Sequence, residues 1–269
     1  MTAESRGAER ADSPGIFAVE RHGRIVDRLR RKGRLESAEI AAEFQVSGET
    51  VRRDLIVLEQ AGVLKRVHGG AVLTAVTGVI PDVHQRETIM RSEKAKIAQA
   101  AGRYVPAQGG LILIDAGTTT HAFTEVYTFD AATTVVTPSL VVADEVLRRS
   151  ESNVHTLGGS VNPRTWAESG DWTLHALSGM QADVVFLGAS GVTVARGATT
   201  SDHTDAMVKR AMVKASRRRV LLCDSAKIGV AHLSHFADPG DIDVLITGAK
   251  ANGSELDGLR TLGVEVVVV

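Results

Sequence analysis

Short runs of β-branched and other apolar residues recur through the C-terminal part of the chain, and they constrain its fold more than any other feature. Stretches with helical spacing, such as residues 139–149 and 205–215, separate several of these runs. Strands that are apolar on both faces are typical of parallel sheets covered by helices on each side. We therefore predict an α/β domain with a mostly parallel sheet over residues 92–269. The runs occupy residues 111–114, 134–137, 154–157, 184–187, 220–223, 244–247 and 264–269.

The N-terminal part of the chain has a different pattern. Three short segments with helical spacing, at residues 24–31, 35–44 and 48–60, precede a ribbon at 63–72 that turns at Gly69 and Gly70. Three helices and a ribbon in this order predict a winged helix-turn-helix over residues 20–73. The expected fold class is thus an α+β N-terminal winged helix-turn-helix joined to an α/β, mostly parallel-sheet domain. Residues 1–19 are expected to form a disordered tail and residues 74–91 a linker.

Charge is unevenly distributed, although the formal net charge of the chain is only -1. Residues 21–71 contain eleven Lys and Arg against seven Asp and Glu. A basic segment on an acidic body indicates an anionic partner for that segment alone, and the third predicted helix can lie in a DNA major groove. A protein-interaction module with the same fold is the alternative. The residues expected to face double-stranded DNA are Ser47, Thr50, Arg52 and Arg53 around this helix and Lys65, Arg66 and His68 on the ribbon.

Turns rich in glycine and hydroxyl groups follow five of the predicted strands. Ligands of open α/β sheets bind outside the carboxyl ends of the strands, where free backbone N–H groups and hydroxyls favour an anion. Each turn alone is more often a cap or a simple turn, but five in one sheet predict a joint pocket for a small phosphorylated sugar or polyol. The expected pocket residues are Asp115, Gly117, Thr118, Thr119, Thr120, Thr137, Ser139, Gly158, Gly159, Gly188, Ala189, Ser190, Gly191 and Lys227.

Several classes of site and location are not expected. The chain has no apolar window long enough for a membrane span and no apolar leader, so a cytoplasmic protein without membrane contact is predicted. His232 and His235 have no Cys or Glu at ligand spacing, and we expect no metal and no other cofactor. Cys223 is predicted to be a packing residue. Trp166 and Trp172 are interpreted as packing or oligomer contacts, with ligand stacking as the alternative.

The motifs of both parts together resemble the DeoR/GlpR family of bacterial transcriptional regulators. The resemblance covers about residues 20 to 269 and implies a homo-oligomeric repressor of carbohydrate metabolism genes that binds operator DNA. It also implies a C-terminal sensor domain similar to ribose-5-phosphate isomerase that responds to phosphorylated sugars. In the N-terminal part the resemblance rests on Val46-Ser47, Thr50-Val51-Arg52-Arg53-Asp54-Leu55, Leu58-Glu59, Gly62-Val63-Leu64 and His68-Gly69-Gly70-Ala71. In the C-terminal part it rests on Arg86, Glu93-Lys94, Ile97-Ala98, Asp115, Gly117-Thr118-Thr119, Leu157-Gly158-Gly159, Gly188-Ala189-Ser190-Gly191, Lys209-Arg210-Ala211-Met212 and Asp224-Ser225-Ala226-Lys227.

The sequence departs from the family pattern at three positions. Pro138 stands where the family usually has Asn, Gly248 where Asp is usual, and Asp205 where Glu is common. The alternative function is a sugar-phosphate isomerase-like enzyme. The related isomerases carry an Asp-Gly-Ala-Asp-Glu loop, and this chain has Leu187 to Gly191 there, without an acid. We therefore expect a pocket that binds without converting its ligand, and no catalytic residue.

Overall fold

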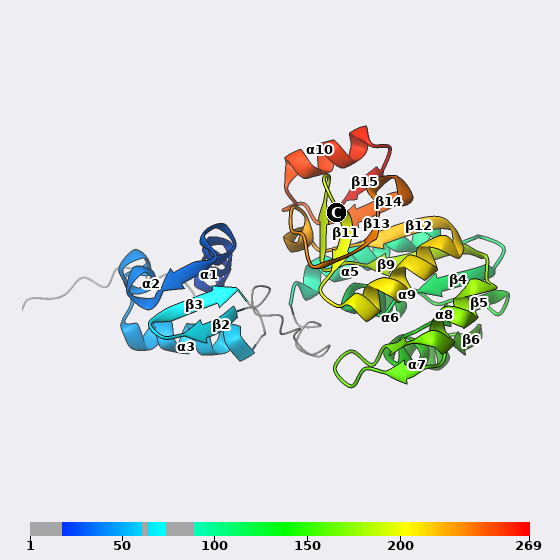
Figure 1. The fold of residues 1–269 in the computed structure, drawn as a ribbon, viewed down its shortest axis with the longest axis horizontal. Coiled ribbons are helices and arrows are strands. Elements are labelled where there is room, and N and C mark those ends of the chain that lie inside the picture. Colours follow the sequence, from blue (N-terminus) through cyan, green and yellow to red (C-terminus); the bar gives the residue numbers. More distant parts are fainter. Residues whose placement is uncertain (1–17, 61–63, 74–88) are drawn as a thin grey trace, which may run out of the picture. The chain divides into compact units, whose positions relative to one another are not determined.

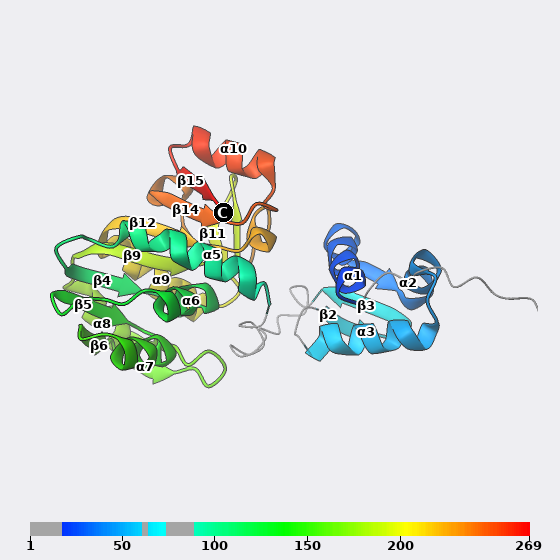
Figure 2. The same ribbon diagram turned by 180° about the vertical axis from the view of Figure 1, so that it is seen from behind.

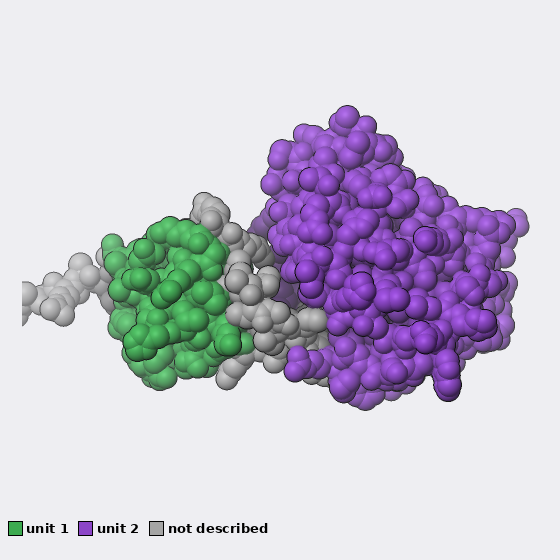
Figure 3. Space-filling model, viewed as in Figure 1, with its two compact units in different colours: residues 1–79 green, residues 80–269 purple. Residues whose placement is uncertain are grey.

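The computed structural model describes residues 18–60, 64–73 and 89–269. The chain divides into two compact units, Met1–Val79 and Ile80–Val269 (Figure 3). Each unit has a hydrophobic core of its own. The expected tail at 1–19 and linker at 74–91 lie almost entirely outside the described residues.

The first unit is a winged helix-turn-helix, as predicted (Figure 1). Its strands pair antiparallel in the order β1-β3-β2. Apolar residues from all three helices and from the strands pack together, among them Ile25, Val51 and Leu55, which are almost fully buried. The elements are α1 (Ala18–Lys32), β1 (Arg34–Glu36), α2 (Ser37–Phe44), α3 (Gly48–Gln60), β2 (Leu64–Val67) and β3 (Gly70–Leu73).

Two details of this unit differ from the sequence-based expectation. The first helix begins at Ala18 rather than at residue 24. The segment expected to be helical from residue 35 begins as strand β1, because Leu35 pairs with Ala71 of β3 and is 1% exposed in the core. Gly33, with a φ of 73°, ends α1 and lets the chain turn into this strand.

The second unit is built on a seven-stranded sheet in which every neighbouring pair is parallel. The strand order is β15-β14-β12-β9-β4-β5-β6, which confirms the predicted α/β class. The strands are β4 (Gly110–Ile114), β5 (Thr133–Thr137), β6 (Asn153–Thr156), β9 (Ala182–Gly188), β12 (Ser216–Leu222), β14 (Val244–Thr247) and β15 (Glu265–Val268). The main helices are α5 (Arg91–Ala101), α6 (Thr118–Val126), α7 (Leu140–Arg149), α8 (Asp171–Ser178), α9 (His203–Lys214) and α10 (Gly253–Thr261).

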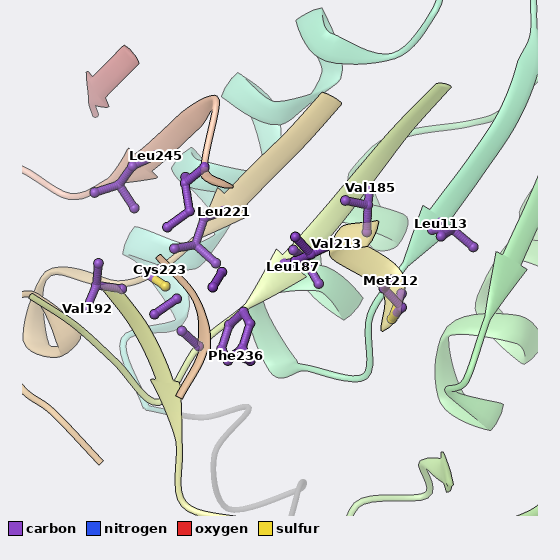
Figure 4. Packing of buried hydrophobic residues seen from close by; sticks show 14 of the residues in the cluster. Leu113, Val185, Leu187, Val192, Met212, Val213, Leu221, Cys223, Phe236 and Leu245 are labelled. Carbon is purple, nitrogen blue, oxygen red and sulfur yellow. The ribbon is translucent and has the colours of Figure 1, made fainter. Parts of the chain in front are cut away.

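Helices cover both faces of this sheet. In β9, Val184 and Phe186 belong to the core cluster that also includes residues of α5, α6 and α7. Helices α5 and α6 lie in front of the sheet in Figure 2. Val185 and Leu187 point to the opposite cluster, which includes Met212 of α9 and is seen in Figure 4. This alternation explains why the strands are apolar on both faces.

The strand order reverses between β4 and β9. From β4 the chain continues to β5 and β6 on one side, and it then returns to β9 on the other side of β4. The loops that leave β4 and β9 therefore diverge, which opens a crevice at their carboxyl ends. Two small antiparallel sheets occur in the same unit. They are β7-β8 (Ser160–Val161 and Glu168–Ser169) and β10-β11-β13 (Gly191–Thr193, Gly197–Thr200 and Ser234–Ala237).

Candidate functional site

Helix α3 presents two arginines to solvent. Its buried side consists of apolar residues such as Val51 and Leu55. Ser47 caps the helix, since its Oγ accepts a hydrogen bond of 3.1 Å from the backbone N–H of Thr50. On the outer side, the Arg52 and Arg53 side chains are 58% and 77% exposed. Both guanidinium groups are thus accessible to a large ligand.

Glu49, in the first turn of α3, pairs with both arginines. Its carboxylate accepts hydrogen bonds of 2.8 Å and 2.9 Å from Nε and Nη2 of Arg52, and Oε1 lies 3.3 Å from Nε of Arg53. The hydrogen bonds from Arg52, with smaller effects of Arg53, lower the pKa of Glu49 to about 2. All three side chains remain more than half exposed.

Two other acids of α3 attach this helix to the rest of its unit. Asp54 is buried, and it accepts hydrogen bonds of 2.6 Å and 3.0 Å from Arg21 of α1. Burial raises the pKa of Asp54, but the hydrogen bonds from Arg21 and His22 outweigh it, so the pKa lies below its usual value. Glu59 accepts from the backbone N–H and from Nε of Arg66 in β2, at 2.7 Å and 2.6 Å. These contacts fix α3 against α1 and the β2–β3 ribbon.

The second unit has a cavity of about 170 Å³ at the carboxyl ends of β4 and β9, where the strand order reverses. Six segments line it: the loops after β4, β5 and β9, the β7–β8 hairpin, the stretch from the end of β11 into α9, and a single residue after β12. The lining residues are Asp115, Ala116, Gly117, Thr118, Thr119, Pro138, Asn162, Thr165, Ala167, Glu168, Ser169, Gly188, Ala189, Ser190, Thr200, Ser201, Asp202, Thr204, Asp205, Val208, Lys209 and Lys227.

One wall of the cavity is the N-terminus of α6. Gly117 precedes this helix and offers no side chain to cap it, and the first N–H groups of a helix have no partner within it. The hydroxyl of Thr119 is buried and has no hydrogen-bond partner among the described residues. Lys94 of α5 donates a hydrogen bond of 2.8 Å to Oγ1 of Thr118. This wall therefore offers donors and a positive helix end, which suits an anion.

A second group of residues that line the cavity forms a buried ion cluster. Lys209 of α9 donates to Oδ2 of Asp115 and, at 3.2 Å, to the carbonyl oxygen of Gly188. Oδ2 of Asp115 also accepts from the backbone N–H of Gly188 at 2.9 Å, so this carboxylate bridges the ends of β4 and β9. Oδ1 of Asp205 lies 3.7 Å from Nζ of Lys209. Burial raises the pKa of Asp205; Lys209 lowers it in part and Asp115 raises it again.

Helix α5 contacts the cavity walls through two adjacent residues. Lys94 reaches Thr118 in the wall just described, and Glu93 reaches the segment that carries Lys227. The carboxylate of Glu93 accepts from the backbone N–H of Ser225 at 2.5 Å and from its hydroxyl at 3.0 Å. Gly248 packs directly on this carboxylate, and a Cβ at that position would overlap it. The glycine thus makes room for the Glu93–Ser225 contact.

Comparison with known proteins gives a family match for each of the two units. The family model "DeoR C terminal sensor domain" matches residues 89–249, and "DeoR-like helix-turn-helix domain" matches residues 21–77. The protein named "Uncharacterized HTH-type transcriptional regulator FruR" of Bacillus subtilis (strain 168) is 34% identical over 87% of this chain and 93% of its own length. The chain belongs to the DeoR family of transcriptional regulators.

Two further matches are more distant. The "Glycerol-3-phosphate regulon repressor" of Escherichia coli (strain K12) is 28% identical over 86% of this chain and 91% of that protein. Among solved structures, ribose 5-phosphate isomerase A from Neisseria gonorrhoeae is 20% identical with a TM-score of 0.37, over 52% of this chain and 54% of that chain.

Membership of the DeoR family decides between the functions that the sequence left open. This DeoR-family protein is a DNA-binding transcriptional regulator and not an isomerase-like enzyme. In the part of the chain that the structure describes, no helix is long and apolar enough to cross a membrane. The exposed face of α3 is accordingly the candidate DNA interface of the regulator, with Lys65 and His68 exposed on the ribbon beside it.

Eight of the fourteen predicted pocket residues line the cavity of this DeoR-family sensor unit: Asp115, Gly117, Thr118, Thr119, Gly188, Ala189, Ser190 and Lys227. The other six, Thr120, Thr137, Ser139, Gly158, Gly159 and Gly191, do not line it.

Local hydrogen bonds and close packing account for the six residues outside the cavity. Thr120 Oγ1 donates to the carbonyl oxygens of Asp115 and Gly117. Thr137 Oγ1 accepts from the backbone of Ser139, whose own hydroxyl caps α7. A Cβ at either Gly159 or Gly191 would meet backbone oxygen, and the N–H of Gly158 binds the Glu168 carboxylate at 2.9 Å.

Sequence reasoning did not place Lys209 and Asp205 in the site, nor the β7–β8 hairpin residues Asn162 and Thr165. The signal that could have found the first two is their spacing, because Asp205 and Lys209 are four residues apart and share one side of α9. A lysine at 4% exposure inside a helix requires a buried partner. The hairpin residues carry no comparable signal, since only tertiary contacts bring the hairpin to the cavity.

Proposed function

We propose that this regulator binds a small phosphorylated sugar or polyol in the cavity, and that binding changes its affinity for operator DNA. The observation that carries the proposal is the wall at the start of α6. There an uncapped helix N-terminus and Thr119, whose buried hydroxyl has no hydrogen-bond partner among the described residues, line the same small cavity. Buried hydroxyls are normally hydrogen-bonded, so this one indicates a missing acceptor such as a phosphate oxygen.

The rest of the cavity suits the hydroxyl groups of the same ligand. Lys227, whose side chain is 26% exposed, supplies a cation near the phosphate end. The Asn162 amide and the Asp205 carboxyl lie among the lining groups and can hydrogen-bond a polyol. The Escherichia coli relative is named for the regulon of glycerol-3-phosphate, which is a phosphorylated polyol of this class. Of the predicted ligand contacts we retain the eight that line the cavity and add Asp205, Lys209 and Asn162.

We further propose that the protein acts as a homo-oligomeric repressor. A single winged helix covers a short stretch of DNA, and specific sites are commonly read as two half-sites by dimers. Trp172 at the start of α8 is 77% exposed and Trp166 of the β7–β8 hairpin is 48% exposed, so both can pack against a second copy. Bacterial operator DNA lies in the cytoplasm, and the protein is proposed to act there.

Helix α5 is the proposed route from the cavity toward the DNA-binding unit. It is the first described helix after the segment that joins the two units. Lys94 of α5 donates a hydrogen bond to Thr118 in the cavity wall at the start of α6. Glu93 of α5 accepts a hydrogen bond from Ser225 in the segment that carries Lys227. A ligand that draws these two walls together therefore changes the surroundings of both side chains. Reducing operator affinity tenfold needs only ~1.4 kcal/mol of differential binding.

A thermal-shift screen of the full-length protein tests the ligand proposal. Glycerol 3-phosphate, hexose 6-phosphates, the unphosphorylated compounds and inorganic phosphate are the probes. A ligand at about 100 times its Kd stabilises by ~2.7 kcal/mol, or about 5–10 °C for a unit of this size. The response should vanish in Lys227→Ala and persist in Lys250→Ala, which removes an exposed lysine outside the cavity. A normal response of Lys227→Ala would place the ligand elsewhere.

A further inference from the structure

The three acidic residues of α3 differ in which elements their hydrogen-bond partners belong to. Asp54 binds Arg21 of α1, and Glu59 binds the backbone and side chain of Arg66 in β2, so both connect the helix to other elements. Glu49 has its hydrogen-bond partners on α3 itself, namely Arg52 and Arg53. All three of these side chains are exposed, and they cover the first turns of the helix. The contacts of Glu49 therefore contribute nothing to the attachment of α3, and they concern its DNA-facing surface alone.

A carboxylate at this place opposes DNA binding in general. The N-terminal residues of a recognition helix lie closest to the DNA, whose phosphates repel negative charge. Glu49 is ionised at any physiological pH, because its pKa is lowered to about 2. It also occupies Nε and Nη2 of Arg52 and approaches Nε of Arg53, which are groups that would otherwise bind phosphate oxygens.

The same contact restricts how Arg52 can point. A guanidinium bound through both Nε and Nη2 to one carboxylate is held in a fixed plane, and its remaining N–H groups point away from that carboxylate. Specific recognition of guanine needs this kind of fixed, planar presentation, because two N–H groups must meet O6 and N7 together. Phosphate binding has no such requirement, since a flexible arginine can follow any backbone.

We infer that Glu49 is a positioning residue for sequence recognition: it orients Arg52 for a base edge and keeps Arg52 and Arg53 from pairing with the phosphates of arbitrary DNA. Its carboxylate lowers the affinity for DNA of any sequence. The loss is smallest for DNA that presents a base edge to Arg52. Glu49 thereby raises the ratio of specific to non-specific affinity. The inference depends on DNA binding by α3 and is independent of the ligand in the cavity.

The test compares the full-length wild type with Glu49→Gln, which keeps the shape of the side chain and removes its charge. Two probes are used: a random-sequence duplex pool, and the duplexes that the wild type enriches from that pool. Fluorescence anisotropy gives the Kd for each probe over a range of salt concentrations. Asp144→Asn is the matched control, because Asp144 forms an exposed i,i+4 pair with Arg148 on α7 and its loss changes the net charge equally.

For Glu49→Gln we expect a lower Kd for the random pool and a smaller ratio between the Kd values for the two probes. Each arginine that gains a phosphate contact steepens the slope of log affinity against log salt concentration by about 0.9. A fourfold drop in salt should therefore raise the random-pool affinity of Glu49→Gln about 3.5-fold more than that of the wild type for each such arginine. Asp144→Asn should behave as wild type. An unchanged salt slope and affinity ratio in Glu49→Gln would overturn the inference. So would equal loss of affinity for both probes with an unchanged circular dichroism spectrum, since Glu49 would then serve only to stabilise the helix.

Discussion

The contact between Glu93 and Ser225 allows a direct test of the proposal that helix α5 links ligand binding in the cavity to DNA binding. Glu93→Gln keeps the side-chain length but removes the charge and one of the two acceptor oxygens that now bind the N–H and hydroxyl of Ser225 at 2.5 Å and 3.0 Å. A hydrogen bond to a charged group contributes ~1.5–3 kcal/mol. Losing one such bond equals or exceeds the ~1.4 kcal/mol that separates a tenfold response from none. The variant should therefore lose most of the response.

The assay measures operator affinity by fluorescence anisotropy with and without saturating ligand, and ligand affinity by calorimetry. Glu93→Gln should bind operator as the wild type does without ligand and should still bind ligand within a few-fold. The ratio of operator affinities with and without ligand should fall toward one. Glu145→Gln, which removes an acid paired with Arg149 on α7 at 3.6 Å, is the control and should respond normally.

Two outcomes of this assay have different meanings. A Glu93→Gln protein with the full wild-type response would refute the role of α5 while leaving the proposed ligand intact. A wild type that binds a phosphorylated ligand without any change in operator affinity would instead refute the proposed function itself. Calorimetry separates both from a simple loss of ligand binding.

Three further predictions concern stability and reactivity. Asp54→Asn should destabilise the DNA-binding unit by about 3 kcal/mol in urea denaturation, because it removes the charge of a buried carboxylate that accepts two hydrogen bonds from Arg21. Since the folded-state pKa of Asp54 is lowered, its contribution is fully present above the unfolded-state pKa of about 4 and should be lost as the pH falls through the folded-state value. Gly248→Asp should lower the melting temperature of the second unit and weaken the ligand response, because the added carboxylate overlaps Glu93 and repels it; a stable, responsive variant would contradict this. Cys223 is buried, and burial raises the pKa of its thiol to about 11, so a thiol reagent at neutral pH should react with it only after unfolding.

The sequence predicts well those features that depend on short segments. The turn after β4 combines Asp115 with Gly117 and three threonines, and its position after an apolar run is enough to place it at the edge of a sheet. The exposed arginines of α3 follow in the same way from helical spacing and charge. In each case the signal and the structure lie within a few residues of one another.

Features that depend on distant pairing could not be predicted in this way. Leu35 looks helical in sequence, and it becomes a strand residue because β3, more than thirty residues later, pairs with it. Thr137 and Ser139 follow a strand just as Asp115 does, and Pro138 between them lines the cavity. Their own hydroxyls are used locally instead, since Thr137 accepts from the Ser139 backbone and Ser139 caps α7. Lys209 is separated by 94 positions from Asp115, the carboxylate that makes its burial possible. Which side chains of these turns line the cavity thus depends on tertiary contacts, which the local pattern leaves open.

The Asp115–Lys209 pair lies at the point where the strand order reverses, and its placement is better explained by ligand binding than by stability. A buried ion pair adds little net stability compared with apolar residues of similar size. This pair joins three segments that all line the cavity: the loop after β4, the end of β9 at Gly188 and helix α9. Because it joins three cavity-lining segments, the pair fixes the cavity walls relative to one another, and the proposed binding of a small ligand needs such fixed walls.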